Sequence, residues 1–219
     1  MLSPVVRGMM TAEIRQGGSF MKFINQRDYP HLPYVTRTDM EKEEDRAAGK
    51  TTTVASSACG VCCAVMVADR LLPNCDFDLS QAISLSYETK ANYRRGTTYA
   101  RFAPAFAEKL GLRYETTDDL QVLRNCLHTG GVAVALVQGD RDGKVGLFTH
   151  RGHYITVLNE EPDGRFAVLD PYFYPQKFDE EGREGKVELK NNVLILCSGE
   201  ILLEEGKQDS APFHLFWRK

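Results

Sequence analysis

The sequence feature that most constrains the fold is the apolar run at residues 61–68, VCCAVMVA, in which every residue is apolar or a cysteine. Ser56 and Ser57 precede this run and are typical helix N-cap residues, while Pro73 follows it and ends the helix. A helix that is apolar on all sides is buried on all sides. We therefore expect this helix at the centre of the domain.

The overall composition is that of a soluble globular protein. The chain has 219 residues, of which 42% are hydrophobic and 26% are charged. A formal net charge of −3 offers no basic surface, so nucleic acid is excluded as a partner. The sequence contains no run of about 18 apolar residues, so we expect no membrane association. It carries no signal for an oligomeric state.

The N-terminal residues predict a short leader. The apolar stretch near the start is interrupted by Pro4 and Arg7 and does not resemble a secretory signal, so the expected location is cytoplasmic. We interpret residues 1–20 as a leader of uncertain order, with Met21 as an alternative start. Residues 21–219 are predicted to form one domain, which includes a charged, exposed loop at residues 36–50.

Helix signals come first in the chain and strand signals later. A further helix is predicted with Asp78 or Ser80 as its N-cap, another over residues 98–110 that ends at Gly111, and a third with Thr117 as its N-cap. Extended segments are expected at residues 22–35 and 51–55, and strands at 132–137, 154–158, 166–169, 187–189, 193–196 and 213–217. This segregation predicts an α+β fold with a helical lobe followed by an antiparallel β-sheet lobe.

The six cysteines do not predict a disulfide framework or a metal site. They are Cys59, Cys62, Cys63, Cys75, Cys126 and Cys197, and most are expected to be buried as small apolar side chains. Cys59-x-x-Cys62 could be a redox or zinc pair. However, no second Cys-x-x-Cys supplies further ligands, and no early βαβ unit gives a thioredoxin-like context. We expect no metal and no other cofactor.

Cys59 stands where a helix would activate a thiol. The first amides of a helix are unpaired and carry partial positive charge, so they stabilise a thiolate, which is the nucleophilic form of cysteine. The same amides could donate to an oxyanion that forms beside the sulfur. Gly60 leaves room for the close approach of a substrate or another backbone segment.

A base and an acid follow at the ends of two predicted strands. His153 begins one strand, Asp170 ends the next, and the Glu161–Gly164 turn signal between them brings both residues to the same end of a hairpin. An acid beside a histidine fixes the imidazole tautomer and stabilises the imidazolium cation. His150 is an alternative base, although it precedes Arg151 in a turn rather than entering the strand.

Four short motifs carry a resemblance to a known family. They are SSACG at residues 56–60, GHYI at 152–155, LDPY at 169–172 and NQRDYP at 25–30. Together they resemble the nucleophile, histidine, acid and oxyanion-hole blocks of papain-like cysteine peptidases related to the bacteriocin-processing, double-glycine-leader peptidases. The resemblance extends over residues 22–172, and it implies a papain-like cysteine proteinase fold.

The resemblance also implies a role for each matching residue. Cys59 would be the nucleophile, His153 the general base and acid, Asp170 the group that orients the imidazole, and Gln26 the side chain that donates to the oxyanion. The predicted function is a cysteine peptidase, or thiol-dependent amide hydrolase, acting on a peptide or amide substrate.

Alternative interpretations of these motifs stay open at this stage. A cysteine before an apolar helix is commonly a packing residue, a histidine at a strand start commonly lies in the core or at the surface, and Asp-Pro after a strand commonly forms a turn. The first alternative function is a non-catalytic binding module with the same fold. The second is an acyltransferase that uses the same three residues.

Overall fold

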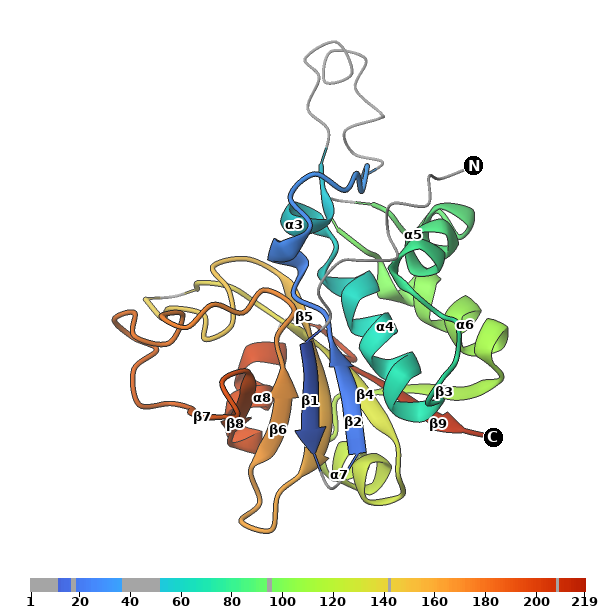
Figure 1. The fold of residues 1–219 in the computed structure, drawn as a ribbon. Coiled ribbons are helices and arrows are strands. Elements are labelled where there is room, and N and C mark those ends of the chain that lie inside the picture. Colours follow the sequence, from blue (N-terminus) through green and yellow to red (C-terminus); the bar gives the residue numbers. More distant parts are fainter. Residues whose placement is uncertain (1–11, 17–18, 37–51, 94–95, 142, 208) are drawn as a thin grey trace.

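The protein has an α+β fold in which helices pack on an antiparallel sheet (Figure 1). The computed structural model describes residues 12–16, 19–36, 52–93, 96–141, 143–207 and 209–219. Within these segments, no helix combines the length and the apolar character needed to cross a membrane.

The main sheet has seven strands in the order β3-β9-β4-β5-β6-β8-β7, and all neighbouring strands run antiparallel. The strands are β3 (Leu112–Thr117), β4 (Val132–Val137), β5 (His153–Glu160), β6 (Phe166–Leu169), β7 (Glu188–Lys190), β8 (Leu194–Cys197) and β9 (Phe213–Arg218). The central strands are rich in valine, leucine and alanine, and they are almost completely buried. Burial of a central strand along its whole length requires cover on both faces of the sheet.

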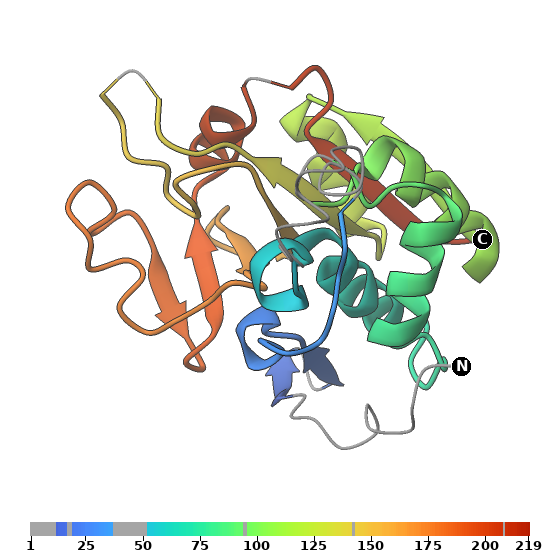
Figure 2. The same cartoon turned by 90° about the horizontal axis from the view of Figure 1, so that it is seen from above.

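Helices supply this cover. They are α3 (Val54–Ser57), α4 (Cys59–Leu71), α5 (Leu79–Glu88), α6 (Tyr99–Leu110), α7 (Leu120–His128) and α8 (Gly199–Gly206). The α4 helix contacts β4 and β5 from one face, while α7 and α8 lie on the other face (Figure 2). Every residue of α4 from Gly60 to Ala68 is buried, which confirms the prediction of a central helix.

Two predicted helix ends are confirmed and two predicted caps are wrong. The Asp78 carboxylate accepts a hydrogen bond from the Gln81 amide at 2.9 Å and caps α5, and Gly111 ends α6 with a φ of 66°. The N-cap of α4 is Ala58, because Ser56 and Ser57 already belong to the preceding short helix α3. Asp119, rather than Thr117, caps α7.

Several elements differ from the sequence prediction. The segment at residues 51–55 was expected to be extended, but its second half begins α3, and Gln26–Asp28 form a 3₁₀ helix within the expected extended segment. Strand β3 and helix α8 were not predicted. Strands β1 (Ala12–Gln16) and β2 (Ser19–Phe23) form a separate antiparallel pair, and residues 37–50 of the predicted charged loop lie outside the described residues.

The hairpin of β5 and β6 sets up the candidate site. Its strands pair antiparallel, with Thr156 opposite Leu169, and the Glu161–Gly164 turn connects them as predicted. His153 is the first residue of β5, and Asp170 directly follows the last residue of β6. An antiparallel pair places the start of one strand beside the end of the other, so these two residues meet at one end of the sheet.

Candidate active site

Cys59 is the first residue of the central helix. It is partly exposed, whereas Cys62 and Cys63, one turn further along, are completely buried. A Cβ atom added to Gly60 would lie 2.7 Å from Thr97 Cβ, so the side of the helix next to Cys59 is packed too tightly for any side chain. Cys59 therefore lies partly exposed at the N-terminal end of α4, while Cys62 and Cys63 lie in the core.

His153 and Asp170 are joined by a short hydrogen bond inside the protein. The distance from His153 Nε2 to Asp170 Oδ1 is 2.7 Å, and the two residues are only 6% and 0% exposed. Because Nε2 is bound to the carboxylate, Nδ1 is the ring nitrogen left to interact with the Cys59 thiol. The structure brings the predicted base and acid together in the arrangement that fixes an imidazole tautomer.

The charges of Cys59 and His153 stabilise each other. Burial by itself would raise the pKa of the Cys59 thiol. The charge of His153, a hydrogen bond with its ring, and backbone hydrogen bonds with Tyr154 and Gly60 together lower that pKa below its ordinary value. Burial would lower the pKa of His153, but the charges of Asp170 and Cys59 raise it to about 9. Each charge in this pair therefore favours the charged form of the other.

Asp170 has two further hydrogen-bond donors besides His153. The Tyr172 amide donates to Oδ1 at 2.7 Å, and the Lys177 ammonium lies 2.5 Å from Oδ2. Burial would raise the pKa of this carboxyl group, but the charges of Lys177 and His153 hold it well below its usual range. Asp170 is therefore a fully ionised carboxylate. Sequence reasoning missed Lys177, which lies in a charged segment that resembles an ordinary surface loop.

Gln26 links the two halves of the site. Its side-chain nitrogen donates to the Ala55 carbonyl at 2.8 Å, in the helix that leads to Cys59. Its backbone amide donates to the Pro171 carbonyl at 2.7 Å, next to Asp170. The Gln26 carboxamide oxygen is buried and lacks a hydrogen-bond partner within the described structure. The structure thus brings Gln26 to the same corner as the other three predicted residues, although one of its N–H groups is used by Ala55.

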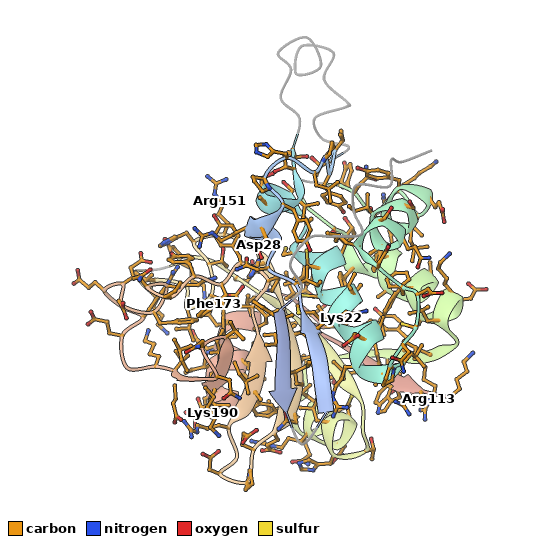
Figure 3. All side chains as sticks on the ribbon, viewed as in Figure 1. Lys22, Asp28, Arg113, Arg151, Phe173 and Lys190 are labelled. Atoms are coloured by element: carbon orange, nitrogen blue, oxygen red, sulfur yellow. The ribbon has the colours of Figure 1, made fainter. Side chains whose placement is uncertain are left out.

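Aromatic and basic side chains cover the outside of this corner. The Tyr172 ring is 40% exposed and stands edge-on to the His153 ring at 6.5 Å, while Phe173 is buried. The Arg27 guanidinium lies over the rings of Tyr172 and Tyr174, at 5.5 Å and 4.7 Å from their centres. In Figure 3, Asp28 and Arg151 lie toward the upper end of the molecule, whereas Lys190 and Arg113 lie toward the lower end.

The alternative base and the alternative cysteine pair have different surroundings. His150 is half exposed and contacts Asp140 at 2.9 Å and Glu180 at 3.1 Å, so it belongs to a surface ion-pair group. Burial raises the pKa of Cys62 well above its ordinary value, opposite in direction to the change at Cys59. Among the described residues, no group of three or more His, Cys, Asp or Glu side chains is arranged to hold a metal ion.

Comparisons with known proteins give distant structural matches but no match in sequence. No family model matches the sequence, and no curated protein matches it. Among solved structures, the chain is similar to a "putative C39-like peptidase" from Bacillus anthracis, at a TM-score of 0.37 and 10% sequence identity. The match covers 55% of this chain and 58% of the other.

Proposed function

We propose that the protein is a cysteine peptidase, or a closely related thiol-dependent amide hydrolase, with a papain-like fold and with Cys59, His153 and Asp170 as its catalytic triad. The observation that carries the proposal is the 2.7 Å bond between His153 Nε2 and Asp170, which leaves Nδ1 to act on the Cys59 thiol at the start of α4. The resemblance of the four sequence motifs to the papain-like peptidases supports the same assignment.

In this proposal, the Cys59 thiolate attacks the carbonyl carbon of a peptide or amide bond. The negative charge that develops on the carbonyl oxygen is stabilised by unpaired amides at the start of α4 and by the second N–H of the Gln26 carboxamide. The His153 imidazolium donates its proton to the leaving amine, and an acyl group remains on the sulfur. His153 then removes a proton from water, which attacks the acyl carbon. The carbon–sulfur bond breaks, the acyl group leaves as a carboxylic acid, and the Cys59 thiolate and His153 imidazolium are restored.

Selective alkylation tests the nucleophile. Cys59 and Cys75 are the two partly exposed cysteines among the described residues, and they lie near opposite ends of α4. Cys75 is partly exposed like Cys59 but lies beyond the C-terminal end of α4 rather than at its start, so it is a matched control. We expect iodoacetamide at neutral pH to label Cys59 at least about tenfold faster than Cys75. Equal rates at the two residues would contradict the proposal.

Hydrolysis of a peptide library tests the reaction itself. We expect cleavage by the wild-type protein and by Cys75→Ala, and no cleavage by Cys59→Ala. Added amines or small thiols separate hydrolysis from acyl transfer, because transfer would give a product that carries the added group. A Cys59→Ala variant that still cleaves would exclude Cys59 as the nucleophile, and a labelled but inactive wild-type protein would favour a binding module.

A further inference from the structure

Lys177 is a buried cation that the proposed reaction does not use. Its side chain is 2% exposed, and its ammonium nitrogen lies 2.5 Å from Asp170 Oδ2 and 3.2 Å from the Tyr172 carbonyl oxygen. It contacts the carboxylate oxygen that His153 leaves free, so Asp170 has one cation on each oxygen. A buried ion pair often contributes little net stability, because both charges lose their contact with water. We therefore ask what else the Lys177–Asp170 pair does.

The catalytic cycle supplies a reason for a second cation. His153 is positive only while it holds two protons, and it becomes neutral when it gives one to the leaving group. Asp170 is completely buried. Without another cation, its carboxylate would be an uncompensated buried charge at that moment, and it would be driven to take up a proton or to turn away from His153. Lys177 neither gives nor takes a proton in the proposed steps, and it pairs with the same carboxylate.

We propose that Lys177 is a positioning residue of the site, the permanent counter-ion that keeps the Asp170 carboxylate charged and directed at His153 while His153 gains and loses its proton. This inference rests on the proposed function. It assigns Lys177 no contact with substrate.

The surroundings hold Lys177 in place from several sides. Its ammonium lies 5.6 Å and 6.0 Å from the ring centres of Tyr172 and Tyr174. The buried Arg183 side chain reaches the Lys177 carbonyl oxygen at 3.4 Å and the Gly146 carbonyl oxygen at 2.7 Å. Arg183 thereby ties the loop that carries Lys177 to the loop that leads into His153.

Burial and the neighbouring negative charges act on the pKa of Lys177 in opposite directions. Burial lowers the pKa of Lys177, as does the charge of Arg183, while the charges of Asp170 and Cys59 oppose this change. Besides His153, the titratable side chains in electrostatic contact with Cys59 include Tyr34, Tyr99, Tyr154, Cys62, Cys63 and Lys177. A cation at Lys177 favours the Cys59 thiolate, so its removal should make thiolate formation harder.

The pH dependence of Cys59 alkylation tests the proposal without a substrate. In Lys177→Met, we expect the midpoint of the alkylation profile to move upward by about one pH unit, which is about tenfold slower labelling below the midpoint. Lys177→Arg should keep the midpoint near that of wild type. Lys186→Met is the matched control, because Lys186 lies exposed in the same loop and should leave the midpoint unchanged. An unchanged midpoint in Lys177→Met would overturn the proposal.

Thermal unfolding provides a second test that remains valid if Lys177→Met folds poorly. Replacing only the lysine leaves the buried Asp170 carboxylate with His153 as its one charged partner in the described site, whereas Asp170→Asn with Lys177→Met removes both charges. We expect the double variant to unfold at a higher temperature than Lys177→Met. If the double variant is less stable than Lys177→Met, the two side chains do not act as a counter-ion pair and the proposal fails.

The two proposals fail in different ways. If wild-type Cys59 is alkylated no faster than Cys75, the proposed nucleophile is wrong, whatever Lys177 does. If wild-type Cys59 is highly reactive and Lys177→Met leaves its profile unchanged, only the role of Lys177 is wrong.

Discussion

The same sheet contains two buried histidines with opposite properties. His153 begins β5 and His214 lies in β9, and they are 6% and 7% exposed. The pKa of His153 is raised to about 9, whereas burial lowers that of His214 to about 4. His214 Nδ1 contacts the Tyr114 hydroxyl at 2.8 Å, and its ring packs against Tyr99 at 4.9 Å.

The difference shows what makes a buried histidine a candidate base. Burial disfavours the imidazolium at both positions, but only His153 has a carboxylate at 2.7 Å and a thiol on its other side. A tyrosine hydroxyl satisfies the His214 ring nitrogen without stabilising a positive charge. His214 therefore contributes to the packing of the sheet, while the surroundings of His153 are suited to proton transfer.

The largest expected effect separates the two histidines by activity. Replacement of His153 by alanine removes the proton donor for the leaving group and the cation beside the thiolate. We expect the rate of peptide hydrolysis to fall by about 10² to 10⁴-fold. His214→Ala should retain activity at temperatures where it remains folded, as checked by circular dichroism. If His153→Ala and His214→Ala both fold and lose the same fraction of hydrolytic activity, the two histidines do not differ in function.

A smaller effect is expected when the surroundings of His153 are made more like those of His214. Asp170→Asn keeps the shape of the side chain but removes the negative charge. The pKa of His153 should then fall, since burial is no longer opposed by a carboxylate, and alkylation of Cys59 at neutral pH should slow by about 10- to 100-fold. Labelling at the wild-type rate would show that the Asp170 charge is not needed.

The pH dependence of hydrolysis is expected to be bell-shaped. Activity should rise as the Cys59 thiol, whose pKa is lowered, loses its proton, and it should fall as His153 loses its proton near pH 9. His214 should add no step above about pH 4. A measurement of kcat/KM across this range checks the profile, and an alkaline limb near pH 6.5 would contradict a stabilised imidazolium.

A separate expected effect concerns stability, where the two histidines act on opposite sides of pH 6.5. The pKa of His214 is about 4 when folded and 6.5 when unfolded, so stability falls as pH drops between these values, by roughly 3 kcal/mol in total. The folded-state pKa of His153 lies above 6.5, so its stabilising contribution is complete below 6.5 and is lost as pH rises toward 9.

Urea unfolding at several pH values tests this prediction. In His214→Phe, the loss of stability between pH 6.5 and pH 4 should be smaller than in wild type, while the loss toward pH 9 should remain. If the free energy of unfolding falls equally between pH 6.5 and pH 4 in wild type and in His214→Phe, the fold does not hold His214 neutral.

Sequence patterns predicted most of the central architecture. The apolar run of α4, the Asp78 cap, the Gly111 stop and the turn between β5 and β6 are local signals, and each of these elements is present. The hairpin alone sufficed to predict that His153 and Asp170 would meet. Their catalytic roles, and those of Cys59 and Gln26, stay predictions.

The elements that the sequence did not predict depend on distant partners. Strand β3, LRYETT, is largely polar, and it is a strand because it pairs along its whole length with β9, about a hundred residues later. The Ser198 side chain caps the N-terminus of helix α8, but the helix has only a weak apolar face. Lys177 lies seven residues from Asp170 in a charged segment, and only the folded loop shows that its ammonium turns inward.

The contrast between the two histidines is tested most directly by a pH titration by NMR of the protein labelled in its histidine rings, with assignments from His153 and His214 variants. We expect His153 to titrate near pH 9 and its midpoint to fall in Asp170→Asn, while His214 remains neutral down to about pH 4. Midpoints near 6.5 for both rings, or a His153 midpoint that does not depend on Asp170, would contradict this expectation.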